Sequence, residues 1–173
     1  PKALLEVQGI PLLEHTIRYL MYFGVDEIIV NVHHHASQII RFLEEHRNFG
    51  IRIEISDEQD ELLDTGGGLY KARRFFDDGK PFILSTSDVI TDLNLKDMCR
   101  FHQEHDPLVT LAVKHRESSR EFLFDHDYRL CGWQNNVTGE IRWARHIKES
   151  KKIAFSTVHF INPRIFDFMI ERG

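Results

Sequence analysis

Apolar strand-like runs and amphipathic helical patterns alternate along the first two thirds of this 173-residue chain. The strand-like runs are rich in β-branched residues, a composition typical of strands buried on both faces of a parallel sheet. Between them, apolar residues recur every three or four positions, which indicates helices with one buried face. This alternation predicts an α/β fold with a doubly wound, mostly parallel sheet and right-handed crossovers. The expected helices are Pro11–Phe23, Ser37–His46, Gly67–Phe76 and Leu95–His105, and the expected strands are Glu27–Val32, Ile51–Ile55, Pro81–Ser85 and Leu108–Val113.

The pattern changes after Lys114, where short strand-like runs separated by turn residues replace the helices. These runs predict a small antiparallel β insertion around residues 121–145. A strand that returns to the main sheet and a last helix are expected to follow. The short runs are Glu121–Asp125, Arg129–Trp133 and Glu140–Trp143, the return strand is Ile153–Ile161, and the helix is expected from Arg164 onward.

Composition and charge disfavour several classes of protein. With 173 residues, 42% of them hydrophobic and 28% charged, the chain has the size and balance of one compact globular domain. The formal net charge is −5 and there is no basic tract, so nucleic acid is not expected as a partner. The apolar runs are too short to cross a bilayer and no signal-peptide pattern opens the chain. We therefore expect no membrane association and a cytoplasmic location.

The spacing of cysteine and histidine gives little support for a disulfide or a metal framework. Cys99 and Cys131 lie far apart and are expected to be free thiols. Consecutive residues of an extended segment point in alternating directions, so His33, His34 and His35 cannot all grip one ion. We expect a turn at these histidines rather than a metal site.

Three glycines and a later acid are the candidates for chemistry. Gly66, Gly67 and Gly68 follow the acidic loop 56–61 and open a helical pattern, where backbone N–H groups can approach a phosphorylated ligand closely. Asp88 follows the next strand, where an acid can bind a divalent cation. Either signal alone is weak, because such glycines also serve close packing and such acids also cap helices. Their order on successive strand–helix units would place both at one cleft.

With these motifs in view, the sequence resembles the sugar-1-phosphate nucleotidyltransferases, or nucleotide-sugar pyrophosphorylases. The most similar branches are bacterial N-acetylmuramate-1-phosphate uridylyltransferases and mannose-1-phosphate guanylyltransferases. The resemblance spans essentially the whole chain, and four segments in a fixed order carry it. These segments are Pro1–Leu13, Leu63–Gly68, Ser87–Asp92 and Ala154–Pro163.

The resemblance implies a Rossmann-like fold, an NTP and a sugar 1-phosphate as substrates, and Mg²⁺ as cofactor. The sugar phosphate would attack the α-phosphate of the nucleotide, and pyrophosphate would leave. Lys2 matches a lysine that neutralises phosphate and Asp88 matches the acid that binds Mg²⁺, so these two are the expected catalytic residues. Gly66, Gly67 and Gly68 match the loop against which the nucleobase and ribose lie.

The resemblance also locates the sugar side of the site and two departures from the family pattern. The segment around Thr157 matches the sugar-side wall. A lysine is expected near the sugar phosphate, and Lys148 is our candidate, with Lys151 and Lys152 competing for the role. Ser87 and Thr157 stand where the family usually has glycine. Ser87 would narrow the approach of the nucleotide, and Thr157 would crowd the sugar.

We expect residues 1–173 to form a nucleotidyltransferase domain that is incomplete at both ends. The resemblance places a glycine-rich phosphate loop before Pro1 and a second metal-binding acid after Gly173. The 173 residues by themselves are therefore expected to be inactive, even if the parent protein is an enzyme.

The sequence leaves two functions open. Lys2, the three glycines and Asp88 favour an enzyme that makes a nucleoside-diphosphate sugar. Ser87 and Thr157 favour a catalytically silent module that binds a sugar nucleotide or a partner subunit. A homo-oligomer is compatible with both. The base and the sugar are selected by pocket shape rather than by a motif, so the sequence does not identify them.

Overall fold

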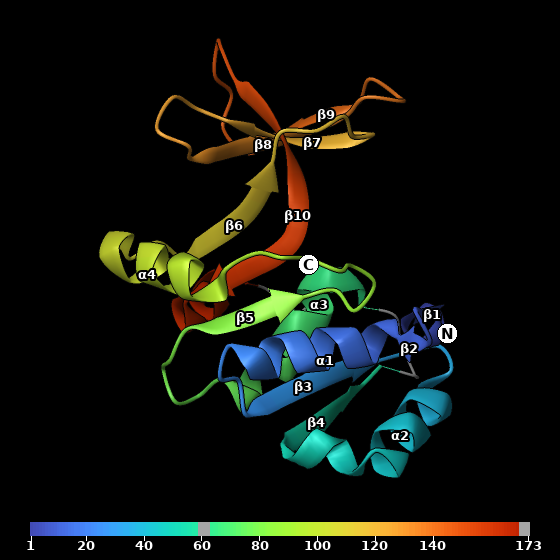
Figure 1. Ribbon diagram of the computed structural model, residues 1–173. Coiled ribbons are helices and arrows are strands. Elements are labelled where there is room, and N and C mark those ends of the chain that lie inside the picture. Colours follow the sequence, from blue (N-terminus) through green and yellow to red (C-terminus); the bar gives the residue numbers. More distant parts are fainter. Residues whose placement is uncertain (59–62, 170–173) are drawn as a thin grey trace. The chain divides into compact units, whose positions relative to one another are not determined.

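The computed structural model describes residues 1–58 and 63–169 of the chain (Figure 1). Contacts divide the chain into two compact units. The first comprises Pro1–Val109 and the segment from Phe160 onward, and the second is Thr110–His159. None of the helices in the described ranges is long and apolar enough to cross a membrane.

The first unit is built on a parallel pair of strands, β3 (Glu27–Val32) and β4 (Arg52–Asp57), which lie side by side in Figure 1. Their register runs from Glu27↔Arg52 to Val32↔Asp57, so both strands end at the same edge. The other elements are arranged around this pair. In chain order the unit contains the 3₁₀ turn Lys2–Leu4, β1 (Glu6–Val7), β2 (Ile10–Pro11), α1 (Leu12–Tyr22), β3 (Glu27–Val32), α2 (Ala36–Glu45), the 3₁₀ turn Arg47–Gly50, β4 (Arg52–Asp57), α3 (Asp64–Lys71), the 3₁₀ turn Ala72–Phe75, β5 (Phe82–Ser85), α4 (Leu95–His105) and the 3₁₀ segment Pro163–Phe168.

One face of the β3–β4 pair is covered by α1 and α2. Ile17 of α1 and Leu43 of α2 are 1% and 2% exposed, and both belong to one buried apolar cluster with Val32 of β3. Alternate residues of the two strands pack against that cluster, as the two-residue period of a strand requires. These strand residues are Ile28, Val30, Ile53 and Ile55. The face of the pair that packs against α1 and α2 is therefore apolar. Asn31, which follows Val30 in β3, lies on the opposite face.

β5 and α4 complete the first unit. β5 is hydrogen bonded to β10 (Lys151–Ile161) and not to β3 or β4, so the described ladders do not form one continuous parallel sheet. α4 begins after Asn94, whose side chain accepts hydrogen bonds from the backbone N–H groups of Lys96 and Asp97. The ring of His102 on the buried face of α4 lies 4.9 Å from that of Phe160, measured between centroids.

The second unit is an antiparallel sheet. β10, β7, β8 and β9 lie in that order, and β6 pairs with β10. A turn centred on Asp125 joins β7 to β8, and its carboxylate accepts hydrogen bonds from the N–H groups of Asp127 and Arg129. The strands are β6 (Val109–Lys114), β7 (Arg120–Phe124), β8 (Leu130–Asn135), β9 (Ile141–Trp143) and β10 (Lys151–Ile161).

The predicted α/β class is confirmed, with parallel strands between helices and an antiparallel sheet where the insertion was expected. The turn at the three histidines is also confirmed, and it ends at His35 with φ 59°. The helix expected at Gly67–Phe76 is wrong in its bounds, because α3 spans Asp64–Lys71 and a 3₁₀ turn follows it. Gly66, which was expected before the helix, therefore lies inside it together with Gly67 and Gly68. The helix expected from Arg164 is a 3₁₀ segment.

Thr157 lies within β10 and has a left-handed backbone, φ 59°. This conformation costs a non-glycine residue about 1–2 kcal/mol, whereas glycine adopts it freely. We expect Thr157→Gly to raise the free energy of unfolding by about 0.5–1 kcal/mol in urea denaturation. Thr110→Gly in β6, where the backbone φ is not positive, is the matched control and should lower it by a similar amount. Changes of the same sign in both variants would contradict the strain assigned to Thr157.

Candidate functional site

The structure brings together Lys2 and Asp88, which are 86 residues apart in the sequence. Nζ of Lys2 lies 2.5 Å from Oδ2 of Asp88. Asp88 sits in the turn after β5, and Lys2 opens the 3₁₀ turn at the start of the chain. In Figure 1 the arrows of β3 and β5 both point toward the side where the N-terminus lies. The contact therefore forms at the carboxyl ends of the strands, where α/β folds place their ligands.

Asp88 is both charged and accessible. Hydrogen bonds from Lys2 and Thr86 hold the pKa of Asp88 below its ordinary value, so its carboxylate is ionised at neutral pH. The side chain of Asp88 is 30% exposed and that of Lys2 is 71% exposed. Ser87 lies half-buried in the same turn. An ionised carboxylate that solvent can reach is suited to a divalent cation, and the neighbouring ammonium is suited to a phosphate.

The three glycines of α3 have different surroundings. A Cβ added at Gly66 would meet nothing within 4 Å, and Gly66 is exposed. A Cβ at Gly67 would lie 2.7 Å from Cβ of Leu63, and one at Gly68 would lie 2.3 Å from Oε1 of Glu58. Close packing, the alternative explanation for such glycines, thus accounts for Gly67 and Gly68. Of the three, Gly66 alone presents its backbone to open space.

Sequence reasoning missed Glu58 and Asn31, which lie directly beneath α3. Glu58 is 1% exposed, and its carboxylate accepts a hydrogen bond of 2.9 Å from Nδ2 of Asn31. Glu58 was placed in a polar loop, whereas β4 continues to Asp57 and Glu58 follows it at once. An acid just after a strand is the same signal that singled out Asp88, so the pattern could have identified Glu58 as well.

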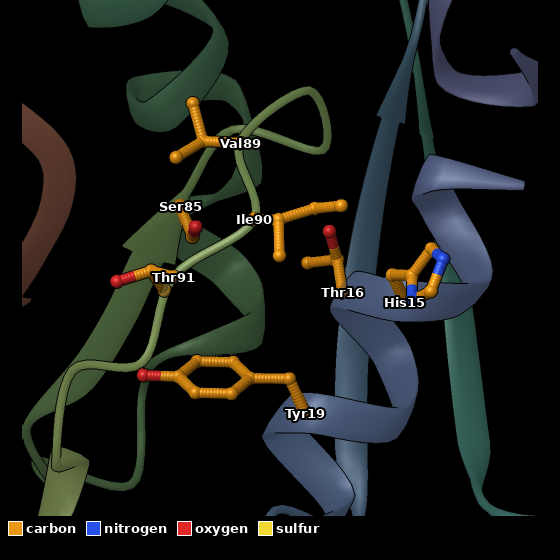
Figure 2. Close-up of a pocket in the computed structure, with 7 residues that line it drawn as sticks. All are labelled: His15, Thr16, Tyr19, Ser85, Val89, Ile90 and Thr91. Atoms are coloured by element: carbon orange, nitrogen blue, oxygen red, sulfur yellow. The ribbon is translucent and has the colours of Figure 1, made fainter. Parts of the chain in front are cut away.

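A cavity of about 220 Å³ lies between α1 and the segment around the end of β5 (Figure 2). Neither Lys2 nor Asp88 lines it, and it contains none of the three glycines. Tyr19 closes one side and donates a hydrogen bond of 2.5 Å to the backbone O of Leu93. The candidate site is therefore the carboxyl edge of the strands and not this cavity. The lining residues are His15, Thr16, Tyr19, Ser85, Val89, Ile90 and Thr91.

The expected sugar-side residues belong to the second unit. Thr157 lies within β10, and Lys148 is exposed in the bend before that strand. Lys151 is engaged inside the unit, because its Nζ lies 3.7 Å from the centre of the Tyr128 ring. Lys152 is exposed next to it. Within the second unit, Lys148 and Lys152 are thus less engaged than Lys151.

Ligand atoms of Asp125, His126 and Asp127 lie within 4.8 Å of one another. Asp125 already accepts two backbone hydrogen bonds, and its Oδ2 lies 2.5 Å from Nη2 of Arg145. The backbone N–H of Arg129 is the main cause that lowers the pKa of Asp125. These bonds account for the cluster as the frame of a hairpin turn.

We expect Asp88→Asn to lower the free energy of unfolding at pH 7 by less than about 1 kcal/mol, because the ion pair with Lys2 is largely exposed. The pKa of Asp88 is lowered on folding, so the pair stabilises the fold above the ordinary pKa of aspartate. That contribution is lost as the pH falls through the lowered pKa. Urea denaturation should show the difference shrinking between pH 7 and about pH 3. Lys2→Met should add no further loss to Asp88→Asn, and additive losses would contradict the pairing.

Comparison with known proteins places these residues in a family. The sequence model of a family described as nucleotidyl transferase matches residues 1–122. Mannose-1-phosphate guanyltransferase of Gibberella zeae is 36% identical over 124 residues, which are 70% of this chain and 34% of that protein. Mannose-1-phosphate guanyltransferase beta-B of Xenopus laevis is 33% identical over 124 residues, which are again 70% of this chain and 34% of that protein. The match thus spans about a third of the length of these relatives.

A solved structure shows the same fold at low sequence identity. HddC from Yersinia pseudotuberculosis, complexed with GMP-PN, superimposes with a TM-score of 0.77 over 96% of this chain and 69% of that chain, at 19% identity. That likeness concerns the fold alone. The family match covers most of the chain, including Lys2, α3 and Asp88. The chain belongs to the nucleotidyl transferase family, as its resemblance to the sugar-1-phosphate nucleotidyltransferases predicted.

Proposed function

We propose that the protein transfers a nucleoside monophosphate from an NTP to a sugar 1-phosphate, forming an NDP-sugar and pyrophosphate. The observation that carries this proposal is the contact of Lys2 with Asp88 at the carboxyl edge of the strands in a nucleotidyl transferase chain. Two relatives are mannose-1-phosphate guanyltransferases, and the structure of HddC contains GMP-PN. These names support a nucleotide and a sugar phosphate as the substrates.

The reaction requires positioning and charge neutralisation more than covalent chemistry. A phosphate oxygen of the sugar 1-phosphate attacks the α-phosphorus of the NTP, and the bond from that phosphorus to the pyrophosphate oxygen breaks. Lys2 would neutralise negative charge on the phosphates. Its side chain is 71% exposed, so its ammonium can turn from Asp88 to a bound phosphate. The open backbone at Gly66 would provide a surface for the nucleobase and ribose.

Asp88 has the properties of a ligand for Mg²⁺. The ion is usually held by one or two carboxylates together with phosphate oxygens and water, and Asp88 supplies one ionised, partly exposed carboxylate. Bound there, Mg²⁺ would neutralise phosphate charge and help to orient the nucleotide. Ser87 would lie beside the nucleotide, Thr157 would contact the sugar, and Lys148 would contact the sugar phosphate. The cytoplasmic location expected from the sequence stays a prediction.

A silent binding module is the second candidate function. It is favoured by Thr157, a branched residue with a strained backbone where the family pattern has glycine in the expected sugar wall. Such a module would bind a sugar nucleotide without releasing pyrophosphate. Turnover measurements therefore separate the two candidates.

We expect the full-length protein to release pyrophosphate from at least one of UTP, GTP, CTP and dTTP when a sugar 1-phosphate and Mg²⁺ are present. Asp88→Ala should lower kcat/KM about 100-fold, because a charged group at the phosphates is lost. The assay measures pyrophosphate for each NTP with and without the sugar phosphate. Binding of the nucleotide without turnover would favour the silent module. Undiminished activity of Asp88→Ala would contradict the role of Asp88.

Gly66→Ala is expected to stabilise the fold and weaken nucleotide binding at the same time. Alanine is favoured over glycine within a helix by about 0.5–1 kcal/mol, and the added methyl group meets nothing in the protein. The same methyl group would stand where we place the nucleobase, so KM for the NTP should rise about tenfold while KM for the sugar phosphate is unchanged. Thermal unfolding and steady-state kinetics on one preparation measure both effects. An unchanged KM for the NTP would contradict the placement of the nucleobase against Gly66.

A further inference from the structure

A polar pair, Asn31 and Glu58, lies where α3 packs against the ends of β3 and β4. Glu58 is 1% exposed, and Oε1 accepts a hydrogen bond of 2.9 Å from Nδ2 of Asn31. The backbone N–H of Glu58 donates to the O of Val32 at 2.8 Å, so the end of β4 is tied to the end of β3. Burying a carboxyl group is costly unless hydrogen bonds satisfy it. A buried Glu58 at this point calls for an explanation in what it contacts.

The pair lies directly against Gly68 of α3. A Cβ at this position would be 2.3 Å from Oε1 of Glu58 and 2.9 Å from Nδ2 of Asn31. The end of a side chain can often move aside at little cost. Here Glu58 is enclosed and hydrogen bonded to Asn31, so movement would break that bond. Glycine has no Cβ, so at position 68 it lets α3 approach the strands this closely.

A second attachment lies three residues further along the same helix. Nζ of Lys71 donates a hydrogen bond to the backbone O of Asp57, the last residue of β4. Residues three apart share one face of a helix, so Gly68 and Lys71 mark the face that docks on the strand ends. Gly66 is two residues from Gly68 and faces away from them, in agreement with its exposure.

We propose that Asn31 and Glu58 act as positioning residues, which set how closely α3 packs on the strand ends and thereby where the backbone of α3 at Gly66 meets the nucleotide. This inference rests on the proposed function, because it concerns the nucleotide side of the same site. Neither Asn31 nor Glu58 is required to touch the nucleotide. Loss of the pair would let α3 shift, and a misplacement of about 1 Å is enough to weaken binding substantially.

The first test compares variants of Glu58 in the full-length protein. Glu58→Ala should raise KM for the NTP about tenfold, with kcat and KM for the sugar phosphate changed less than threefold. Glu58→Gln keeps the shape and an oxygen that can accept from Asn31, so it should restore most of the affinity. Glu54→Ala, in β4, where the side chain pairs with Arg52, is the matched control and should leave KM unchanged. A purely structural role would instead lower the fraction of active protein and so reduce kcat at constant KM.

The second test uses the steric contact, and its single variants Asn31→Ala and Gly68→Ala remain available if Glu58→Ala fails to fold. Asn31 is exposed, so Asn31→Ala removes the hydrogen-bond donor without opening the core and should raise KM for the NTP in the same direction. Gly68→Ala should also raise KM for the NTP in the wild-type background. Once Glu58→Ala has removed the obstructing carboxylate, Gly68→Ala should add less than a twofold further change. If the effects of Gly68→Ala and Glu58→Ala on KM were additive, the contact between positions 68 and 58 would not be the cause of the rise in KM.

Calorimetric titration with the NTP distinguishes failure of this inference from failure of the proposed function. If the wild-type protein binds the NTP and both Asn31→Ala and Glu58→Ala bind it equally well, the positioning role is overturned and the proposed function stands. If the wild-type protein binds none of the four NTPs, the proposed function fails, and the inference fails with it. Weaker binding by both variants, restored in Glu58→Gln, is the result that we expect.

Discussion

Parallel pairing of β3 with β4 is the constraint on which the candidate site depends. The register that ends at Val32↔Asp57 brings both strand ends to one edge, so Asn31 and Glu58 meet although 27 positions separate them. The pairing is stabilised from the opposite face by the apolar cluster of α1 and α2, where Ile17 is 1% exposed. A one-residue slip of either strand would exchange its faces, moving apolar side chains out of that cluster and Asn31 away from Glu58. Core packing and site geometry are thus set by the same register.

The candidate site joins two regions with different energetic characters. Lys2 and Asp88 form an exposed ion pair, and such pairs add little to stability because water and salt compete for both charges. A pair of this kind is easily exchanged for ligand contacts. The contact of Glu58 with Gly68 is enclosed and determines how backbone segments pack. One region can therefore respond to a ligand while the other keeps its shape.

The fold was predictable where a local signal is strong. β3 and α4 have the expected bounds, because a β-branched run and an apolar period with Asn94 at its start are decisive. The start of α3 was not predictable, since glycine has low helix propensity. The contact of Gly68 with Glu58 is likewise not contained in the local pattern. The pairing of β5 with β10 is likewise a matter of long-range topology. Residue spacing alone could not predict the contact between Lys2 and Asp88, because it joins segments 86 residues apart.

The unlike surroundings of the three glycines in α3 have an evolutionary consequence. Position 68 can accept a larger residue only after position 58 has become smaller, because the two side chains compete for one volume. The two positions should therefore vary together as the family diverges. Position 66 has no such partner in the protein, so its history should follow the nucleotide rather than any neighbouring residue. Three consecutive glycines would then be under different selective constraints, because each has different surroundings.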